Sequence, residues 1–108
     1  MEYCARIVLV DKGAEVFGPE ALELVKLIDT QKSIKEAAST MKISSAKAWK
    51  YIRAIEQYLK EPAIVKSRGG ADNYNVHISP ACRSLLEKYE SFEKKSQGAI
   101  EGYFKQIF

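Results

Sequence analysis

The segment Ser33–Leu59 constrains the fold most, because it has the pattern of two helices separated by very few residues. Ser33, with Glu36 three residues later, has the form of a capping box, and apolar residues follow at helical spacing as far as Met41. A second helix begins at Ser44 or Ser45, and its apolar stripe contains Ala48, Ile52, Ile55 and Leu59, with Trp49 beside them. Small residues in the first helix allow a close crossing, so the segment predicts a helix-turn-helix.

The face opposite that stripe carries hydroxyls, amines and a phenol. Near the start of a recognition helix, such side chains reach phosphates and base edges in the major groove of DNA. The alternative is an ordinary solvated helix face, because charged residues usually serve that purpose. The predicted DNA-binding residues of this helix are Ser44, Ser45, Lys47, Lys50 and Tyr51.

The distribution of charge favours the DNA interpretation more than the net charge of +3 does. Residues 1–30 carry three basic and six acidic side chains, whereas residues 31–60 carry seven basic and two acidic ones. Positive charge is therefore concentrated on the predicted helix-turn-helix, where contacts to phosphates would need it.

Length and composition indicate one cytoplasmic domain. The chain has 108 residues, 46% of them hydrophobic, which is enough for a modest core. Its apolar runs are short, and its N-terminus lacks the basic lead and long apolar region of a signal peptide. Cys4 and Cys82 lie far apart without metal-ligand spacing, so we expect neither a disulfide nor a metal site.

The first thirty residues predict a hairpin followed by a helix. Residues 3–10 have the β-branched character of a strand, residues 11–14 form a turn, and residues 15–17 return as a short strand. Pro19 and Glu20 then begin a helix. The apolar face of this helix is broad enough to meet a partner chain as well as its own domain.

A second hairpin follows the helix-turn-helix. Strands are expected at residues 63–67 and 74–78, joined by a glycine-bearing basic loop at residues 68–73. In that position a hairpin is a wing, and the alternative is a plain surface hairpin. The fold class predicted is α+β, mainly α: a winged helix-turn-helix with a β-hairpin wing and a long C-terminal helix. The wing residues expected to bind DNA are Lys66, Arg68, Gly69 and Gly70.

The last helix, which begins at Ser79 and Pro80, carries apolar residues at alternating steps of four and three. That spacing is typical of a helix that pairs with another helix, although such a face can also pack within its own domain. We therefore expect residues 1–80 to form the DNA-binding domain and residues 81–108 a dimerisation element. The predicted dimer-interface residues are Leu85, Tyr89, Phe92, Ala99 and Tyr103.

Several short motifs, in order and spacing, resemble the N-terminal winged-helix domain of the ModE-type molybdate-responsive transcription regulators. They are Phe17-Gly18-Pro19, Ile28-Asp29, Ser33-Ile34, Ala37-Ala38, Ile43-Ser44, Ala48-Trp49, Glu61-Pro62, Gly69-Gly70 and Ile78-Ser79-Pro80. A more distant likeness is to the reading head of LysR-type regulators. The resemblance implies a dimeric DNA-binding protein.

The sequence departs from the family pattern at three positions. The family's turn usually has glycine where Lys42 stands, and the aromatic and basic residues that often follow the capping serine are Ser45 and Ala46 here. The oxyanion-binding domains of full-length members have no counterpart in these 108 residues, so we expect no molybdate binding and no cofactor.

Two function classes remain. The first is a sequence-specific regulator that binds double-stranded DNA as a homodimer. The second is a winged-helix protein-protein adaptor that uses its apolar helices. No nucleophile or carboxylate pattern accompanies the lone His77, so an enzyme is not expected.

Overall fold

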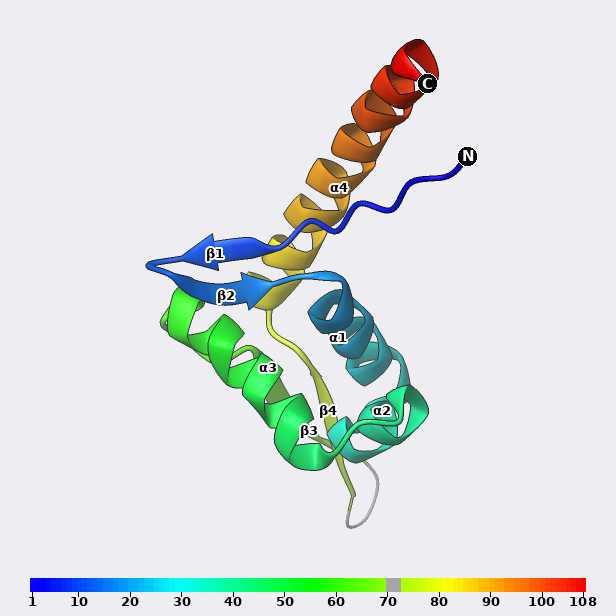
Figure 1. Ribbon diagram of the computed structural model, residues 1–108. Helices are drawn as coiled ribbons and strands as arrows, with labels where there is room; N and C mark the ends of the chain where they lie inside the picture. The colour runs from blue at the N-terminus through cyan, green and yellow to red at the C-terminus, as the bar shows by residue number, and fades with distance from the viewer. Residues whose placement is uncertain (70–72) are drawn as a thin grey trace.

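The computed structural model describes residues 1–69 and 73–108, which form an α+β fold of four helices and two antiparallel hairpins (Figure 1). This arrangement confirms the predicted fold class, a winged-helix-like α+β fold. The elements in chain order are β1 (Leu9–Asp11), β2 (Ala14–Phe17), α1 (Pro19–Gln31), α2 (Ile34–Met41), α3 (Ser45–Leu59), β3 (Ile64–Gly69), β4 (Asn73–Ile78) and α4 (Pro80–Ile107).

Serine caps begin three of the four helices. The Ser33 hydroxyl accepts a 3.1 Å hydrogen bond from the Glu36 backbone nitrogen, and Ser44 accepts an equivalent bond from Lys47. Ser79 caps α4 in the same way. Each cap satisfies one of the backbone donors that a helix start leaves free, so the helix boundaries follow directly from local sequence.

The turn between α2 and α3 depends on a left-handed residue. Lys42 has φ +60°, and the Ile43 nitrogen donates a 3.0 Å hydrogen bond back to the Ala38 carbonyl. A residue in this conformation reverses the chain within two or three positions. Ala37 and Ala38 are fully buried or nearly so, which allows α2 and α3 to approach closely.

A single hydrophobic core lies between the helices. β2 packs on α3, β4 packs on α1, and the first turns of α4 enter the same core. The largest fully buried side chains are Tyr89, Phe17, Leu24, Ile28, Ile52, Ile55, Val25 and Cys82. The apolar faces expected for α1 and for α3 are thus the faces that point into the core.

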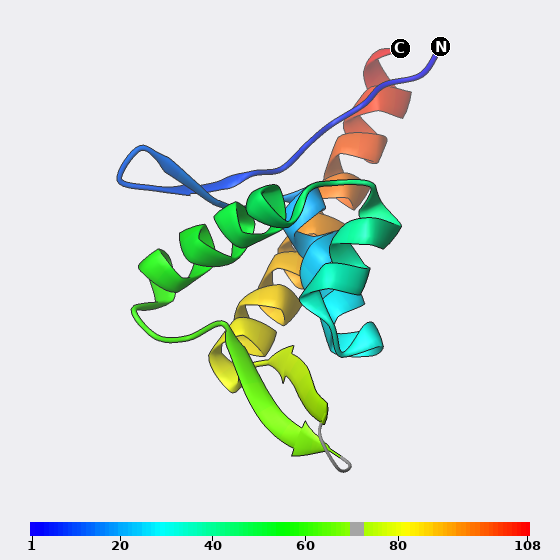
Figure 2. The ribbon, with the colours of Figure 1, turned by 90° about the horizontal axis from the view of Figure 1, so that it is seen from below.

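The first hairpin is shorter than the sequence predicts. Only Leu9–Asp11 forms the first strand, paired with Ala14–Phe17 through a turn at Lys12 and Gly13, both with positive φ. The strand expected at residues 3–10 is therefore confirmed only at its end, and it is wrong for residues 3–8. The return strand β2 has four residues, so the chain before Leu9 has no strand to pair with. It runs instead as an extended arm beside α4 (Figures 1 and 2).

Hydrogen bonds hold this N-terminal arm, residues 1–8, along α4. The Tyr3 hydroxyl donates to Glu101 at 2.7 Å, and the Gln97 amide donates to the Ala5 carbonyl at 3.3 Å. The Tyr3 ring also lies 4.7 Å from the ring of Phe104. The arm thus docks on α4 between Gln97 and Phe104.

Tyr89 joins the arm to the core. Its ring is fully buried 5.0 Å from Phe17, and its hydroxyl donates a 2.8 Å hydrogen bond to the Ile7 carbonyl. Gly98 and Gly102 lie inside one continuous helix that reaches Ile107, although glycine weakens a helix interior.

The second hairpin is anchored at its base and extends farther than predicted. Arg68, Gly69 and Asn73 belong to the strands, so fewer residues connect the strands than expected. Backbone bonds tie the base down: the Ile78 nitrogen donates to the Asp29 carboxylate, and the Ser79 nitrogen donates to the Ala63 carbonyl. The hairpin lies at the end of the molecule opposite both termini (Figures 1 and 2).

The two cysteines are free thiols in different environments. Cys4 is exposed in the arm, whereas Cys82 is buried, and burial raises the pKa of Cys82 to about 11. In the part of the chain that the structure describes, no cluster of three His, Cys, Asp or Glu side chains is placed to hold a metal ion. None of the described helices is long and apolar enough to cross a membrane.

Candidate nucleic-acid interface

The exposed face of α3 is the surface that a helix-turn-helix would present to DNA. Because Ala48, Ile52 and Ile55 point into the core, one side of the helix is left to solvent. The exposed residues of α3 are Ser45, Ala46, Lys47, Trp49, Lys50, Arg53, Gln57 and Tyr58. All but the last two lie in the first nine residues of the helix, the half that reads base edges in known recognition helices.

The predicted reading residues divide into two groups. Ser44, Ser45, Lys47 and Lys50 are exposed at the start of α3, as a DNA contact requires. Tyr51 is half-buried, because the β1–β2 hairpin covers this flank of the helix. Its expected place on the open face is therefore wrong.

A shallow pocket of about 200 Å³ marks where the hairpin meets α3. It is lined by Glu15, Lys47, Lys50, Tyr51 and Ala54. Burial raises the pKa of Tyr51, and the charges of Glu20 and Glu15 raise it further. The two lysines thus lie where the first hairpin meets α3.

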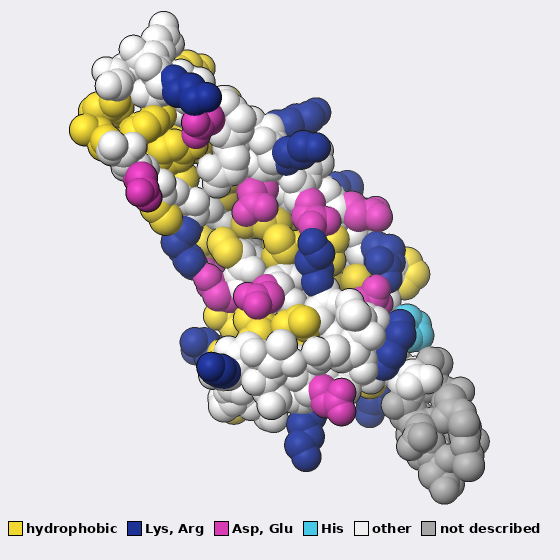
Figure 3. All heavy atoms as spheres, turned by 90° about the vertical axis from the view of Figure 1, so that its right-hand side faces the viewer, with side chains coloured by type: hydrophobic (Ala, Val, Ile, Leu, Met, Phe, Trp, Pro, Cys, Tyr) yellow, Lys and Arg dark blue, Asp and Glu magenta, His cyan; other side chains and the backbone are white. Residues whose placement is uncertain are grey.

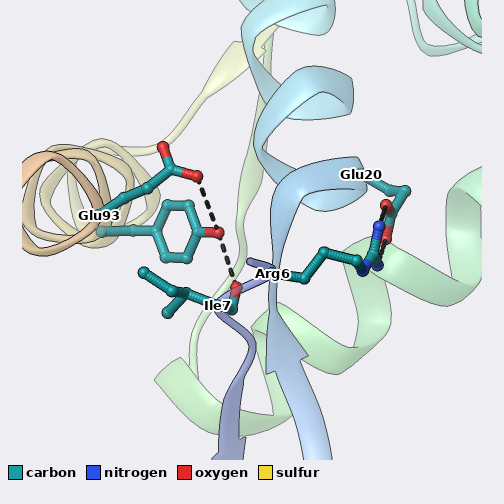
Figure 4. Close-up of polar contacts among 5 residues, drawn as sticks. Arg6, Ile7, Glu20 and Glu93 are labelled. Atoms are coloured by element: carbon teal, nitrogen blue, oxygen red, sulfur yellow. Dashed lines mark hydrogen bonds and ion pairs between the residues drawn. The ribbon is translucent and has the colours of Figure 1, made fainter. Parts of the chain in front are cut away.

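Arg6 and Glu20 form a bidentate ion pair (Figure 4). The two guanidinium nitrogens lie 2.7 and 2.9 Å from the two carboxylate oxygens. Hydrogen bonding to Arg6 lowers the pKa of Glu20, and Lys47 adds a smaller effect in the same direction. The pair connects the N-terminal arm to the start of α1. The arm therefore contacts both α4 and α1.

The wing contributes at least one exposed cation. Lys66 is exposed on β3, which pairs with β4 from Ile64 to Gly69. The backbone of Arg68 and Gly69 lies within β3, but the Arg68 side chain and Gly70 lie outside the described residues. Of the four wing residues predicted, the structure therefore shows the side-chain exposure of Lys66 only.

Two residues on the open face were missed by sequence reasoning. Trp49 was expected beside the buried stripe, yet 36% of it is exposed, and Arg53 is exposed one turn later. The Arg53 guanidinium lies 5.8 Å from the centre of the Trp49 ring. The four-residue spacing of an aromatic and an arginine is a signal that could have identified this pair.

The predicted dimer-interface residues of α4 also fall into two groups, one buried or half-buried and one exposed. Tyr89 is fully buried in the chain's own core, so it cannot lie on a surface that a second copy contacts. Leu85 is half-buried against the same core. Phe92, Ala99 and Tyr103 remain exposed, with Phe92 at 53% and Tyr103 at 64%.

Further exposed apolar residues continue this surface to the end of α4. Ile107 and Phe108 are 71% and 77% exposed. Hydrophobic side chains gather at this end of the molecule, near both termini (Figure 3). Exposed apolar surface of this kind usually marks an interface.

Comparison with known proteins shows distant relatives. No protein-family model matches the chain. It is 28% identical over 104 residues to the molybdenum-pterin-binding protein MopB of Rhodobacter capsulatus, covering 96% of this chain and 38% of that protein. It is 26% identical over 82 residues to the transcriptional regulator ModE of Haemophilus influenzae, covering 76% of this chain and 32% of the regulator.

The molybdenum transport protein ModE of Azotobacter vinelandii is 23% identical over 99 residues, covering 92% of this chain and 37% of that protein. The chain thus spans about a third of the length of the curated relatives it matches. The names of these relatives are those of regulators and of binding or transport proteins, not of enzymes. The chain is a distant homologue of MopB and of the ModE regulators.

Proposed function

We propose that this chain is a sequence-specific regulator that binds double-stranded DNA as a homodimer, in the manner of ModE-type regulators. The observation that carries the proposal is the open face of α3. It begins at a capped helix start, carries Lys47 and Lys50 and is not covered by any other described element. An exposed, basic helix start after a tight turn is suited to the major groove.

The charges around this face support phosphate binding. Lys66 would contact the phosphate backbone from the wing, while Ser44 and Ser45 are small enough to let the backbone of α3 approach a phosphate. Arg68, Gly69 and Gly70 would extend that contact from the wing. Tyr51 would act by holding the β1–β2 hairpin on α3, because it is half-buried there.

The homodimer would form through the C-terminal half of α4. Phe92, near the middle of α4, and Ala99 and Tyr103, in its C-terminal half, are exposed. A two-fold pair of helices would set the two reading heads at a fixed separation, so the DNA site would be a palindrome with half-sites one helical turn, about 34 Å, or a multiple of it, apart. Two of the three relatives have names that refer to molybdenum, but no molybdate-sensing role is assigned to these residues.

The second candidate function is a protein-protein adaptor, which the exposed apolar end of α4 favours. Salt dependence separates the two functions, because phosphate contacts release counterions and apolar contacts do not. Binding of the chain to duplex DNA, measured by fluorescence anisotropy, should weaken steeply between about 50 and about 200 mM salt.

The deciding experiment compares two double variants. Lys47→Ala with Lys50→Ala should weaken binding to all duplexes and flatten the logarithmic salt slope by about two. The matched control is Lys94→Ala with Lys95→Ala, which removes the same charge from an exposed part of α4. If both double variants bind DNA as the wild-type chain does, α3 is not the DNA-binding element and the adaptor function is favoured.

A further inference from the structure

Among the arginines whose side chains the structure describes, Arg53 differs from the other two. Arg6 is paired with Glu20 at 2.7 Å, and Arg83 is paired with Asp29 at 2.7 Å. Arg53 has no ion pair or hydrogen bond with the described residues, and its guanidinium lies over the face of Trp49 at 5.8 Å from the ring centre. Its guanidinium donors therefore remain available to a ligand.

The position of Arg53 places those donors on the surface proposed to face DNA. Trp49, Lys50 and Arg53 are the fifth, sixth and ninth residues of α3, and all three are exposed. The β1–β2 hairpin meets α3 at the flank of Tyr51 and Ala54, where Glu15, Lys47 and Lys50 also line the pocket. Trp49 and Arg53 do not line this pocket, and both are exposed.

We infer that Arg53, held over the ring of Trp49, recognises a guanine in the major groove of the DNA half-site. Arginine is suited to this role because its planar fork donates two parallel hydrogen bonds to guanine O6 and N7. Lysine carries the same charge without the fork. This inference rests on the proposed function and adds to it a base-reading residue.

Trp49 would act as a positioning residue for Arg53. A long exposed arginine loses rotamer freedom when it binds, and packing on an aromatic face in the free protein removes part of that freedom beforehand. The exposed edge of the indole would also meet the neighbouring base pair, where an apolar contact favours the methyl group of thymine.

The experiment replaces guanine by 7-deazaguanine, which lacks the N7 acceptor. The duplex is one selected from a random library by the wild-type chain, and each guanine of the half-site is replaced in turn. At one guanine the wild-type affinity should fall roughly 10-fold, within the range of one good base contact. Arg53→Lys should show a smaller 7-deazaguanine penalty than the wild-type chain, because the lysine ammonium lacks the planar fork. Its salt slope should stay unchanged, because its charge is kept.

Two further variants locate the effect. Trp49→Ala should reduce the discrimination while Arg53 is still present. Gln57→Ala, an exposed change one turn beyond Arg53 on the same helix, should leave the discrimination between guanine and 7-deazaguanine intact. Circular dichroism confirms that each variant is folded, as expected for exposed positions.

The outcomes separate this inference from the function on which it rests. If Arg53→Lys keeps the full 7-deazaguanine penalty, or if the selected half-site contains no guanine that matters, the base-reading role of Arg53 is overturned. The proposed function still stands in that case, provided that the Lys47 and Lys50 variant shows its loss. If the wild-type chain binds no duplex in a salt-dependent way, both are overturned.

Discussion

The Tyr89 hydroxyl donates a 2.8 Å hydrogen bond to the Ile7 carbonyl, which lies 82 residues earlier in the chain. Tyr89 belongs to the helix proposed for dimerisation, and Ile7 belongs to the arm that Arg6 fastens to α1. The bond therefore connects the proposed dimerisation helix α4 with the N-terminal arm and, through Arg6, with α1. If α4 pairs with a second copy, this connection fixes the direction in which each α3 faces.

Tyr89→Phe tests the strength of this connection. The ring stays in the core while the Ile7 carbonyl loses its partner, so the free energy of unfolding should fall by about 1 kcal/mol. Urea unfolding followed by circular dichroism measures the change. Tyr103→Phe is the control, because Tyr103 is 64% exposed and its hydroxyl is open to water. Equal stabilities of the two variants would mean that the Tyr89 bond contributes nothing.

Lys42→Gly should stabilise the turn of the helix-turn-helix. Lys42 has φ +60°, a conformation in which a side chain is strained and glycine is not. The expected gain in the free energy of unfolding is a few tenths to about 1 kcal/mol. Lys35→Gly, at an exposed position in the first turn of α2, should instead destabilise the chain by a few tenths to about 1 kcal/mol. A loss of stability in both variants would contradict the strain argument.

Acid should weaken the link between α1 and α4 at Asp29. The hydrogen bond from Arg83, together with one from the Ile78 nitrogen, lowers the pKa of Asp29 below its ordinary value of 3.8. A lowered folded-state pKa contributes stability that is present above 3.8 and is lost as the pH falls through the lower, folded-state value.

The measurement is urea unfolding of the wild-type chain and of Asp29→Asn from about pH 6 to about pH 2. The wild-type chain should be more stable at the upper end, and the difference should shrink once the carboxylate is protonated. Glu23→Gln, an exposed change on α1, serves as the control and should show no such convergence. A difference that stays constant across the range would show that the charge of Asp29 does not matter.

The chain should sediment as a dimer at micromolar concentration. Phe92→Lys with Tyr103→Lys should give a monomer, because two buried lysines would meet their own copies across a two-fold interface. Ser91→Lys with Gly98→Lys adds the same charge on another face of α4, with open space at Gly98, and should remain dimeric. A wild-type chain that sediments as a monomer, unaltered by truncation after Glu90, would exclude the dimer.

The helix-turn-helix and the wing are encoded locally. Ser33, Ser44 and Ser79 cap helices through bonds to residues three positions ahead, so their effect can be read from short stretches of sequence. The positive φ of Lys42 follows from the need for a tight turn between two amphipathic helices. The strands of the wing follow from β-branched residues on each side of a glycine-bearing loop.

The flanks of α3 and the path of the N-terminal arm were decided only by tertiary structure. Periodicity identifies the stripe Ala48, Ile52 and Ile55, but the residues beside a stripe become buried or exposed according to what packs there. The β1–β2 hairpin covers Tyr51 and leaves Trp49 to solvent. The alternation in residues 3–8 predicts a strand. A strand needs a second strand to pair with, and these residues instead form the arm that packs along α4.

The heptad-like spacing of α4 correctly predicts a helix. It does not predict which residues of the apolar face are buried and which are exposed. Tyr89 and Phe92 are three residues apart on one helix, yet one is buried against Phe17 and the other is 53% exposed. The spacing determines that both lie near one side of the helix. Which part of that side is filled by the chain's own core depends on where the core ends, and that is set by contacts between residues far apart in sequence.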